Sequence, residues 1–271
     1  MDKNAPIGVF DSGVGGLTVV KEIMQQMPGE NIVYFGDTAR VPYGSKSKDT
    51  IIKFSRQITN FLKTKNVKAI VIACNTASAM ALDVIEKEVD MPVIGVVKPG
   101  ARMAVEATKN GKIGVIGTEG TINSGMYLQF IHSMEDSNLQ IFTKACPLFV
   151  PLVEEGLLFD SVTEEIAGRY FSELKAYDID TLVLGCTHYP LLRHTIQKVI
   201  GEKVTLINPA YETAKELRKT LEEMDLCTDR SIIGASQEYY VSDGAEKFLS
   251  FAGSILPGKV NNTNVVNIEQ Y

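Results

Sequence analysis

The chain has 271 residues, of which 45% are hydrophobic and 22% charged, and its formal net charge is −6. This composition is typical of a soluble globular protein and argues against a fibrous or disordered chain. Because Lys and Arg are scattered and the net charge is negative, we expect no nucleic-acid or membrane partner. No secretory leader precedes the first apolar run, and no run approaches the roughly 20 residues that span a bilayer, so we expect a cytoplasmic protein.

Short apolar runs alternate along the chain with longer amphipathic segments. The predicted strands are residues 7–10, 31–35, 69–73, 93–97, 113–116, 181–184 and 204–207. The predicted helices include residues 50–65, 77–88, 162–176 and 212–224, followed by a strand-helix pattern over 239–250 and a poorly packed terminus from residue 257. This alternation indicates parallel sheets covered by helices on both faces.

Two short sequences recur in the same order. Residues 7–13 (IGVFDSG) are echoed by 113–118 (IGVIGT), and residues 69–76 (AIVIACNT) by 181–188 (TLVLGCTH). Two ordered echoes at similar separations favour duplication of one α/β unit. We therefore predict two similar doubly wound parallel-sheet (flavodoxin-like) domains with the active site in the crevice between them. The predicted boundaries are 1–97 with 209–271 for the first domain and 98–208 for the second.

The cysteines and histidines give no pattern for a disulfide framework or a metal. No Cys-x-x-Cys pair occurs among Cys74, Cys146, Cys186 and Cys227, and the three histidines lack paired ligand spacing. We therefore expect reduced thiols and no metal. The loop over residues 11–16 lacks the G-x-G-x-x-G spacing of a dinucleotide site, and no phosphate-binding P-loop motif occurs, so we expect no nicotinamide or nucleotide cofactor.

Polar residues follow four of the predicted strands. They are residues 11–16 (DSGVGG), 74–76 (CNT), Thr118 with Thr121, and 186–188 (CTH). Since ligands of parallel sheets bind at the carboxyl ends of the strands, these residues are candidates for a site. Taken alone, the first segment could be a tight turn before a helix.

A free cysteine is usually a small buried apolar residue, and either Cys74 or Cys186 taken alone would be interpreted in that way. Together they occupy equivalent points of the two repeats. At each point we expect the start of a helix to lower the thiol pKa from about 8.5. Cys146 and Cys227 lack this arrangement and are assigned to structure.

Two thiols on opposite sides of one crevice suit inversion at a carbon centre. A base must remove the proton from one face while an acid delivers another proton to the opposite face, and thiolate and thiol can exchange these roles. A proton α to a carboxylate is weakly acidic, so oriented donors must stabilise the developing charge. The candidate donors are backbone amides and hydroxyls of Ser12, Gly44, Asn75, Thr76 and Thr187.

Five segments, in order, make the sequence similar to a known family. They are residues 8–17 (GVFDSGVGGL), 34–44 (YFGDTARVPYG), 73–77 (ACNTA), 146–156 (CPLFVPLVEEG) and 184–190 (LGCTHYP). Over essentially its whole length the chain resembles the glutamate racemases of the aspartate/glutamate racemase family. The resemblance implies cofactor-independent interconversion of L- and D-glutamate, which supplies D-glutamate for peptidoglycan and so serves cell-wall biogenesis and cell shape. It also implies a homodimer.

The resemblance also implies roles for individual residues. Cys74 and Cys186 would be the acid/base pair, with Asp11 near Cys74, and with His188 and Glu154 assisting Cys186. Because Glu155 is adjacent, either acid could point inward. The implied substrate contacts are Asp11, Ser12, Tyr43, Gly44, Asn75, Thr76, Thr118, Thr121, Thr187 and His188.

Alternatives remain at this stage. An aspartate racemase could use the same two thiols, and two lobes around a crevice could form a binding protein without catalysis. A thiol nucleophile could combine Cys186 with His188, but this gives Cys74 no role. Without the family resemblance, Asp37 and Arg40 would be interpreted as a surface ion pair and residues 42–44 as a simple turn.

Overall fold

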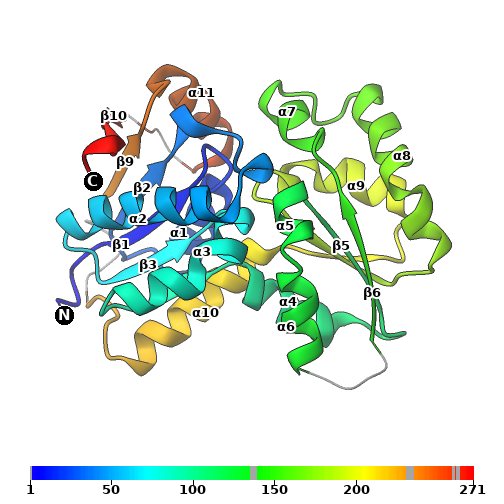
Figure 1. Cartoon of the computed structure of the whole chain (residues 1–271), viewed down its shortest axis with the longest axis horizontal. Coiled ribbons are helices and arrows are strands. Elements are labelled where there is room, and N and C mark those ends of the chain that lie inside the picture. Colours follow the sequence, from blue (N-terminus) through cyan, green and yellow to red (C-terminus); the bar gives the residue numbers. More distant parts are fainter. Residues whose placement is uncertain (1, 135–138, 230–234, 258–259, 261–262) are drawn as a thin grey trace.

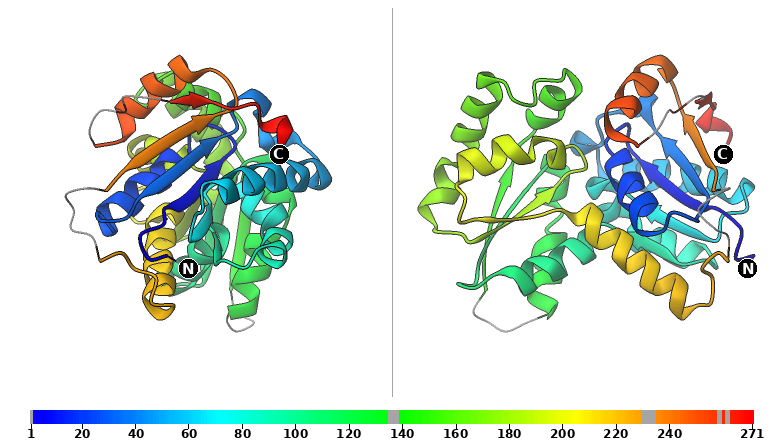
Figure 2. Two further views of the ribbon diagram at one scale, coloured as in Figure 1. Left: turned by 90° about the vertical axis from the view of Figure 1, so that its left-hand side faces the viewer. Right: turned by 180° about the vertical axis from the view of Figure 1, so that it is seen from behind.

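The computed structural model describes residues 2–134, 139–229, 235–257, 260 and 263–271. They form two α/β domains, each built on an all-parallel sheet with helices against both faces (Figure 1). The view from behind shows the two domains lying next to each other, and in the view from the side the first domain lies in front of the second (Figure 2). The predicted fold class is therefore confirmed. Within the described residues, no helix is both long and apolar enough to cross a membrane.

The first domain has a six-stranded sheet in the order β10-β9-β2-β1-β3-β4. Its strands are β1 (Ile7–Asp11), β2 (Ile32–Gly36), β3 (Ala69–Ile72), β4 (Val93–Gly95), β9 (Gln237–Val241) and β10 (Asn264–Val265). Three helices pack on one face, namely α1 (Leu17–Gln26), α10 (Pro209–Glu223) and α11 (Ala245–Ile255). Two helices pack on the other, α2 (Lys48–Thr64) and α3 (Asn75–Glu88).

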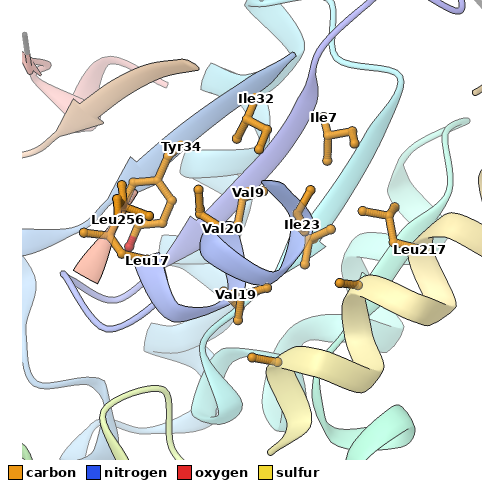
Figure 3. Close-up of a cluster of buried hydrophobic side chains, with 14 of the residues drawn as sticks. Ile7, Val9, Leu17, Val19, Val20, Ile23, Ile32, Tyr34, Leu217 and Leu256 are labelled. Atoms are coloured by element: carbon orange, nitrogen blue, oxygen red, sulfur yellow. The ribbon is translucent and has the colours of Figure 1, made fainter. Parts of the chain in front are cut away.

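The core of this domain follows from the alternation of side chains along β1. Ile7 and Val9 face the cluster beneath α1 and α10, whereas Phe10 faces the cluster beneath α2 and α3. In Figure 3, Leu17, Val20 and Ile23 of α1 lie over β1 and β2, and Leu217 of α10 lies beside them. Burying one such side chain contributes about 1.5–3 kcal/mol to the stability of the fold. Because both faces of the sheet are covered, the ends of its strands are held in fixed positions.

The second domain has a four-stranded sheet in the order β6-β5-β7-β8. Its strands are β5 (Lys112–Gly117), β6 (Gln140–Ala145), β7 (Thr181–Gly185) and β8 (Thr205–Ile207). Helices α4 (Val97–Ala107) and α6 (Met126–Met134) pack on one face, and α7 (Phe149–Glu154), α8 (Ser161–Ala176) and α9 (Arg193–Ile200) on the other. The short helix α5 (Glu119–Asn123) follows β5.

The two repeated sequences occupy equivalent places in the two sheets. In the first sheet Ile7 of β1 pairs with Ala69 of β3, and in the second Ile113 of β5 pairs with Thr181 of β7. The order β2-β1-β3-β4 thus matches β6-β5-β7-β8 strand for strand. The residues that follow β3 and β7 consequently lie at corresponding positions of the two domains.

The chain passes between the domains where a strand end and a helix start adjoin. The strand predicted over 93–97 is shorter than expected, because β4 ends at Gly95 and α4 begins at Val97. Pro99 is accommodated because it lies in the first turn of α4, where its missing N–H is not needed. The chain returns at α10, whose first turn is capped by the side chain of Asn208. The domain boundaries at 97/98 and 208/209 stay a prediction.

The expectation of a poorly packed terminus is wrong for the last residues. Strand β10 pairs with β9, and the following 3₁₀ turn η4 (Ile268–Gln270) buries Ile268 to 3% exposure. The ring of Tyr271 packs edge-on against Phe61 of α2 at 5.3 Å between centroids. These apolar side chains outweigh the local Asn-rich sequence. Residues 261–262, named in the same expectation, lie outside the described residues.

Candidate active site

A cavity of about 420 Å³ lies between the domains, at the carboxyl ends of β1 and β3 of one sheet and β5 and β7 of the other. This volume is within the range of about 300–1,000 Å³ found for small-molecule sites. Its lining comes from both domains: Ser12, Gly13, Val41, Pro42, Tyr43, Gly44, Ser45, Cys74, Asn75, Thr76, Thr118, Glu119, Pro147, Val150, Pro151, Glu154, Cys186, Thr187 and His188.

The two thiols predicted to work together line this same cavity. Cys74 follows β3 and is the N-cap residue of α3, where the backbone N–H of Ala77 donates to its sulfur at 3.5 Å. Cys186 follows β7 directly. Each is 6% exposed. The strand registers explain this arrangement, since both residues leave equivalent strands at the edge where the domains face each other.

The thiol of Cys74 holds its proton firmly. Burial and the nearby Asp11 raise the pKa of Cys74 to about 12, against the lowering effects of the Ala77 N–H and the Ser12 side chain. The expectation that a helix start lowers this pKa is therefore wrong for Cys74, because the partial charge of the helix end is smaller than the effect of burial. Asp11 is itself fully buried, and burial raises its pKa despite the opposing effects of His188 and the Gly13 N–H.

The sulfur of Cys186 faces a histidine. Nδ1 of His188 lies 3.8 Å from Sγ, and Nε2 lies 3.3 Å from a carboxylate oxygen of Glu154. Burial favours the neutral ring, yet the hydrogen bonds to Cys186 and Glu154 raise the pKa of His188 to about 10. The bond to His188 in turn lowers the pKa of Glu154. These two hydrogen bonds thus favour the protonated ring of His188, which lies between the sulfur and a carboxylate.

Of the two adjacent acids at the end of α7, Glu154 is the one that faces the cavity. Glu154 lines the cavity and bonds His188, whereas Glu155 is exposed. The other carboxylate oxygen of Glu154 lies 3.4 Å from Nζ of Lys247, on α11 of the first domain. Sequence reasoning missed Lys247, because it belongs to no motif and approaches the site only when the C-terminal helix returns to the first domain.

The wall formed by residues 42–44 is supported from behind by a buried carboxylate. The hydroxyl of Tyr43 donates to Asp37, which also accepts from Nε of Arg40 at 2.7 Å and from the hydroxyl of Ser242 at 2.8 Å. Asp37 is fully buried, so the interpretation of Asp37 and Arg40 as a surface ion pair is wrong. Residues 42–44 are likewise more than a turn, since all three line the cavity.

Three threonine hydroxyls meet where the domains touch. Thr76 on α3 lies 2.9 Å from Thr118 and 3.2 Å from Thr121, and these two are 3.0 Å apart (all distances between Oγ1 atoms). Thr118 caps α5 by accepting from the N–H of Thr121. Thr76 and Thr118 line the cavity, and Thr121 lies behind them.

Most of the predicted site residues therefore surround one space. Only Asp11 and Thr121 do not line it, and each contacts a residue that does. The apolar wall residues Val41, Pro147, Val150 and Pro151 were not predicted individually, although all lie in segments that carry the family resemblance. Within the described part of the chain, no group of three or more His, Cys, Asp or Glu residues could hold a metal ion.

Comparison with known proteins agrees with this geometry. The family model for Asp/Glu/hydantoin racemases matches residues 7–217. A protein named glutamate racemase from Geobacter metallireducens is 47% identical over 263 residues, covering 97% of each chain.

Two solved structures superpose closely. Glutamate racemase isoform RacE1 from Bacillus anthracis has a TM-score of 0.93 at 42% identity, covering 97% of this chain and 98% of its own. The glutamate racemase from Francisella tularensis in complex with D-glutamate has a TM-score of 0.92 at 40% identity, covering 99% and 100%. The chain belongs to the Asp/Glu/hydantoin racemase family.

Proposed function

We propose that this protein is a glutamate racemase that interconverts L- and D-glutamate without a cofactor, using Cys74 and Cys186 as a two-base pair. The observation that carries the proposal is the presence of two thiols, from equivalent positions of two domains, in the lining of one cavity. A binding protein would have no reason for such a pair. A single thiol nucleophile would leave Cys74 without a role.

In the proposed step one cysteine is a thiolate and the other a thiol. The thiolate takes the α-proton and becomes S–H, leaving the electron pair on the substrate as a carboxylate-stabilised carbanion. The opposite thiol then delivers its proton to the other face of the carbon and becomes the thiolate. The raised pKa of Cys74 favours the form in which Cys74 carries the proton, while Cys186 faces the imidazolium of His188. This form acts on the enantiomer whose α-proton points toward Cys186.

The carbanion needs donors aimed at the substrate carboxylate. The cavity offers hydroxyls from Ser12, Thr76, Thr118 and Thr187 together with the amide of Asn75. In a site with little water, such preorganised dipoles stabilise developing charge more than they would in bulk solvent. Asp11, which affects the pKa of Cys74 and accepts a bond from Thr187, is suited to adjust the proton affinity of the first thiol.

Glutamate as the substrate is supported by the relatives. The Geobacter metallireducens protein carries that name, and the Francisella tularensis structure contains D-glutamate. Proton transfer at the α-carbon does not depend on the length of the substrate side chain, so aspartate is the main alternative substrate. Comparison of the two amino acids as substrates, each in both enantiomers, separates them.

In the cell, we propose that the enzyme acts in the cytoplasm and supplies D-glutamate for peptidoglycan, and thus for cell-wall biogenesis and cell shape. If so, depletion of the protein should stop growth unless D-glutamate is supplied. We also expect a homodimer in solution, which light scattering coupled to size-exclusion chromatography measures directly.

The activity is tested by incubating the purified, reduced protein with L-glutamate or D-glutamate in deuterium oxide without added cofactor. Starting from either enantiomer, we expect the optical rotation to fall to zero and deuterium to enter Cα. Early in the reaction, the product enantiomer should carry deuterium while the recovered substrate is still largely protiated, because the proton removed and the proton delivered belong to different thiols. If a folded sample inverts and exchanges aspartate but not glutamate, or neither amino acid, the proposal of a glutamate racemase fails.

A further inference from the structure

A buried tyrosine of the second domain reaches an asparagine in the cavity wall of the first. Tyr127 lies on α6, is 2% exposed and does not line the cavity. Its hydroxyl donates to Oδ1 of Asn75 at 2.7 Å. Burial raises the pKa of Tyr127 far above its usual range, so the phenol keeps its proton and stays a donor at any pH at which the protein functions.

This bond fixes the orientation of the Asn75 amide. Asn75 is the only acceptor that the Tyr127 hydroxyl has among the described residues, so turning the amide over would leave the phenolic proton buried and unpaired. With Oδ1 occupied, Nδ2 is the end of the amide left for other partners, and no described side chain or backbone group accepts its protons. Asn75 lines the cavity. The two N–H bonds of Nδ2 are therefore available to a ligand.

The orientation decides whether this part of the wall attracts or repels an anion. An amide that turned its oxygen toward a carboxylate would place two acceptors together, while Nδ2 offers two donors. Asn75 is also the first residue of α3, where the backbone N–H groups at the helix start favour negative charge. The side chain and the helix end then act in the same direction.

We propose that Tyr127 is a positioning residue that holds Asn75 with its amide donors toward the substrate carboxylate. The inference rests on the proposed function, in which Asn75 contacts that carboxylate. Tyr127 lies on α6 of the second domain and Asn75 on α3 of the first. The Asn75 amide is therefore held in this orientation only while the two domains are packed together.

Tyr127→Phe tests this with minimal change of volume. We expect kcat/KM for glutamate to fall about ten-fold, as for loss of one well-placed hydrogen bond. The matched control is Tyr189→Phe, because Tyr189 is also buried and donates at 2.8 Å to the backbone carbonyl of Cys146, and neither of these two residues lines the cavity. Both variants should lose comparable thermal stability, but only Tyr127→Phe should lose kcat/KM.

A double-mutant cycle with Asn75→Ala identifies the route of the effect. If Tyr127 acts through Asn75, kcat/KM of the double variant is no lower than that of Asn75→Ala alone. Independent, additive losses of kcat/KM would overturn the inference.

Should Asn75→Ala be too inactive to assay, calorimetric titration with racemic glutamate measures binding without net reaction. We expect Tyr127→Phe to bind glutamate more weakly than Tyr189→Phe does. Wild-type kinetics and binding in Tyr127→Phe would disprove the positioning role while leaving the racemase proposal intact. A wild-type protein without racemase activity would instead remove the function itself.

Discussion

The hydroxyl of Thr187 lies 3.4 Å from a carboxylate oxygen of Asp11, so the loop that carries one thiol is bonded directly to the residue beside the other. A second bond supports it, because the hydroxyl of Thr18 on α1 donates to the backbone oxygen of Thr187 at 3.1 Å. The geometry of Cys186 therefore depends on the first domain as well as on its own strand. Changes made in one domain should disturb chemistry in the other.

Gly15 offers a direct test of this dependence. A methyl group built on Gly15 would contact the hydroxyl of Thr187 and would lie 2.6 Å from Nδ1 of His188, closer than packed atoms allow. Gly15→Ala should displace the imidazole from Cys186 and lower kcat by roughly 100-fold, since catalytic groups misplaced by about 1 Å lose activity of this order. Steady-state kinetics measure the loss.

The control for Gly15→Ala is Gly168→Ala in the middle of α8. Nothing lies within 4 Å of the added methyl there, so activity should be unchanged. Stability should rise by about 0.5–1 kcal/mol, because alanine loses less backbone entropy than glycine in a helix. Full activity in Gly15→Ala would contradict the close packing of the two domains at the site.

Each of the two thiols should serve one face of the substrate α-carbon. Cys74→Ala and Cys186→Ala should each abolish racemisation, because one face of the carbon loses its proton carrier. Each single variant can still exchange the α-proton on the remaining face, so in deuterium oxide one variant should label only one enantiomer and the other variant only the opposite one. Near-normal turnover in either variant would falsify the two-base mechanism.

The arrangement of the thiols could be predicted from the sequence because it depends on local patterns. Apolar runs of four or five residues define β1, β3, β5 and β7, and the echoes between them place Cys74 and Cys186 at matching strand ends. Strand β6 was not predicted, because its residues, Gln140–Ala145, are partly exposed at a sheet edge and lack a continuous apolar run. The edge strands β4 and β8 are more deeply buried than β6 and carry the apolar runs from which they were predicted.

What could not be predicted depends on which distant side chains meet. Asp37 resembles a surface acid in sequence, and its burial involves Ser242, 205 residues away along the chain, as well as its near neighbours Arg40 and Tyr43. The high pKa of Cys74 has the same origin, because burial and the charge of Asp11 are properties of the assembled cavity rather than of the helix start. The contacts of Tyr127 and Lys247 likewise join residues of different domains.

The raised pKa of His188 predicts how stability depends on pH. The pKa rises from 6.5 in the unfolded chain to about 10 in the folded protein, so the protonated ring stabilises the fold fully below pH 6.5. That contribution is lost as the pH rises through about 10. The difference in unfolding free energy between wild type and His188→Asn should therefore shrink between these two pH values.

Urea denaturation at pH 6, 8 and 10 measures this difference. His194→Asn, on the exposed side of α9, reports the effect of the same substitution away from the cavity. A wild-type advantage over His188→Asn that grows with pH would contradict the ion-pair assignment.

Lys247 of the first domain should affect the reactivity of Cys186 in the second domain, through Glu154 and His188. Its ammonium lies 3.4 Å from Glu154, which bonds His188, so Lys247→Met leaves that carboxylate with one partner fewer and a looser hold on the ring. Since the Lys247 side chain is 65% exposed, the effect should be modest, about five-fold in kcat/KM. It should be largest at low salt, because the screening length falls from about 10 Å at 0.1 M to about 3 Å at 1 M ionic strength.

Lys198→Met is the matched control for Lys247→Met, because Lys198 is 59% exposed and pairs with Glu164 within the second domain, outside the cavity lining. We expect it to retain wild-type kcat/KM at every salt concentration, and Lys247→Arg to restore most of the activity. If Lys247→Met loses activity equally at low and high salt, the lysine acts through packing and its charge has no part in positioning Glu154. If Lys198→Met loses as much, the effect is one of general surface charge.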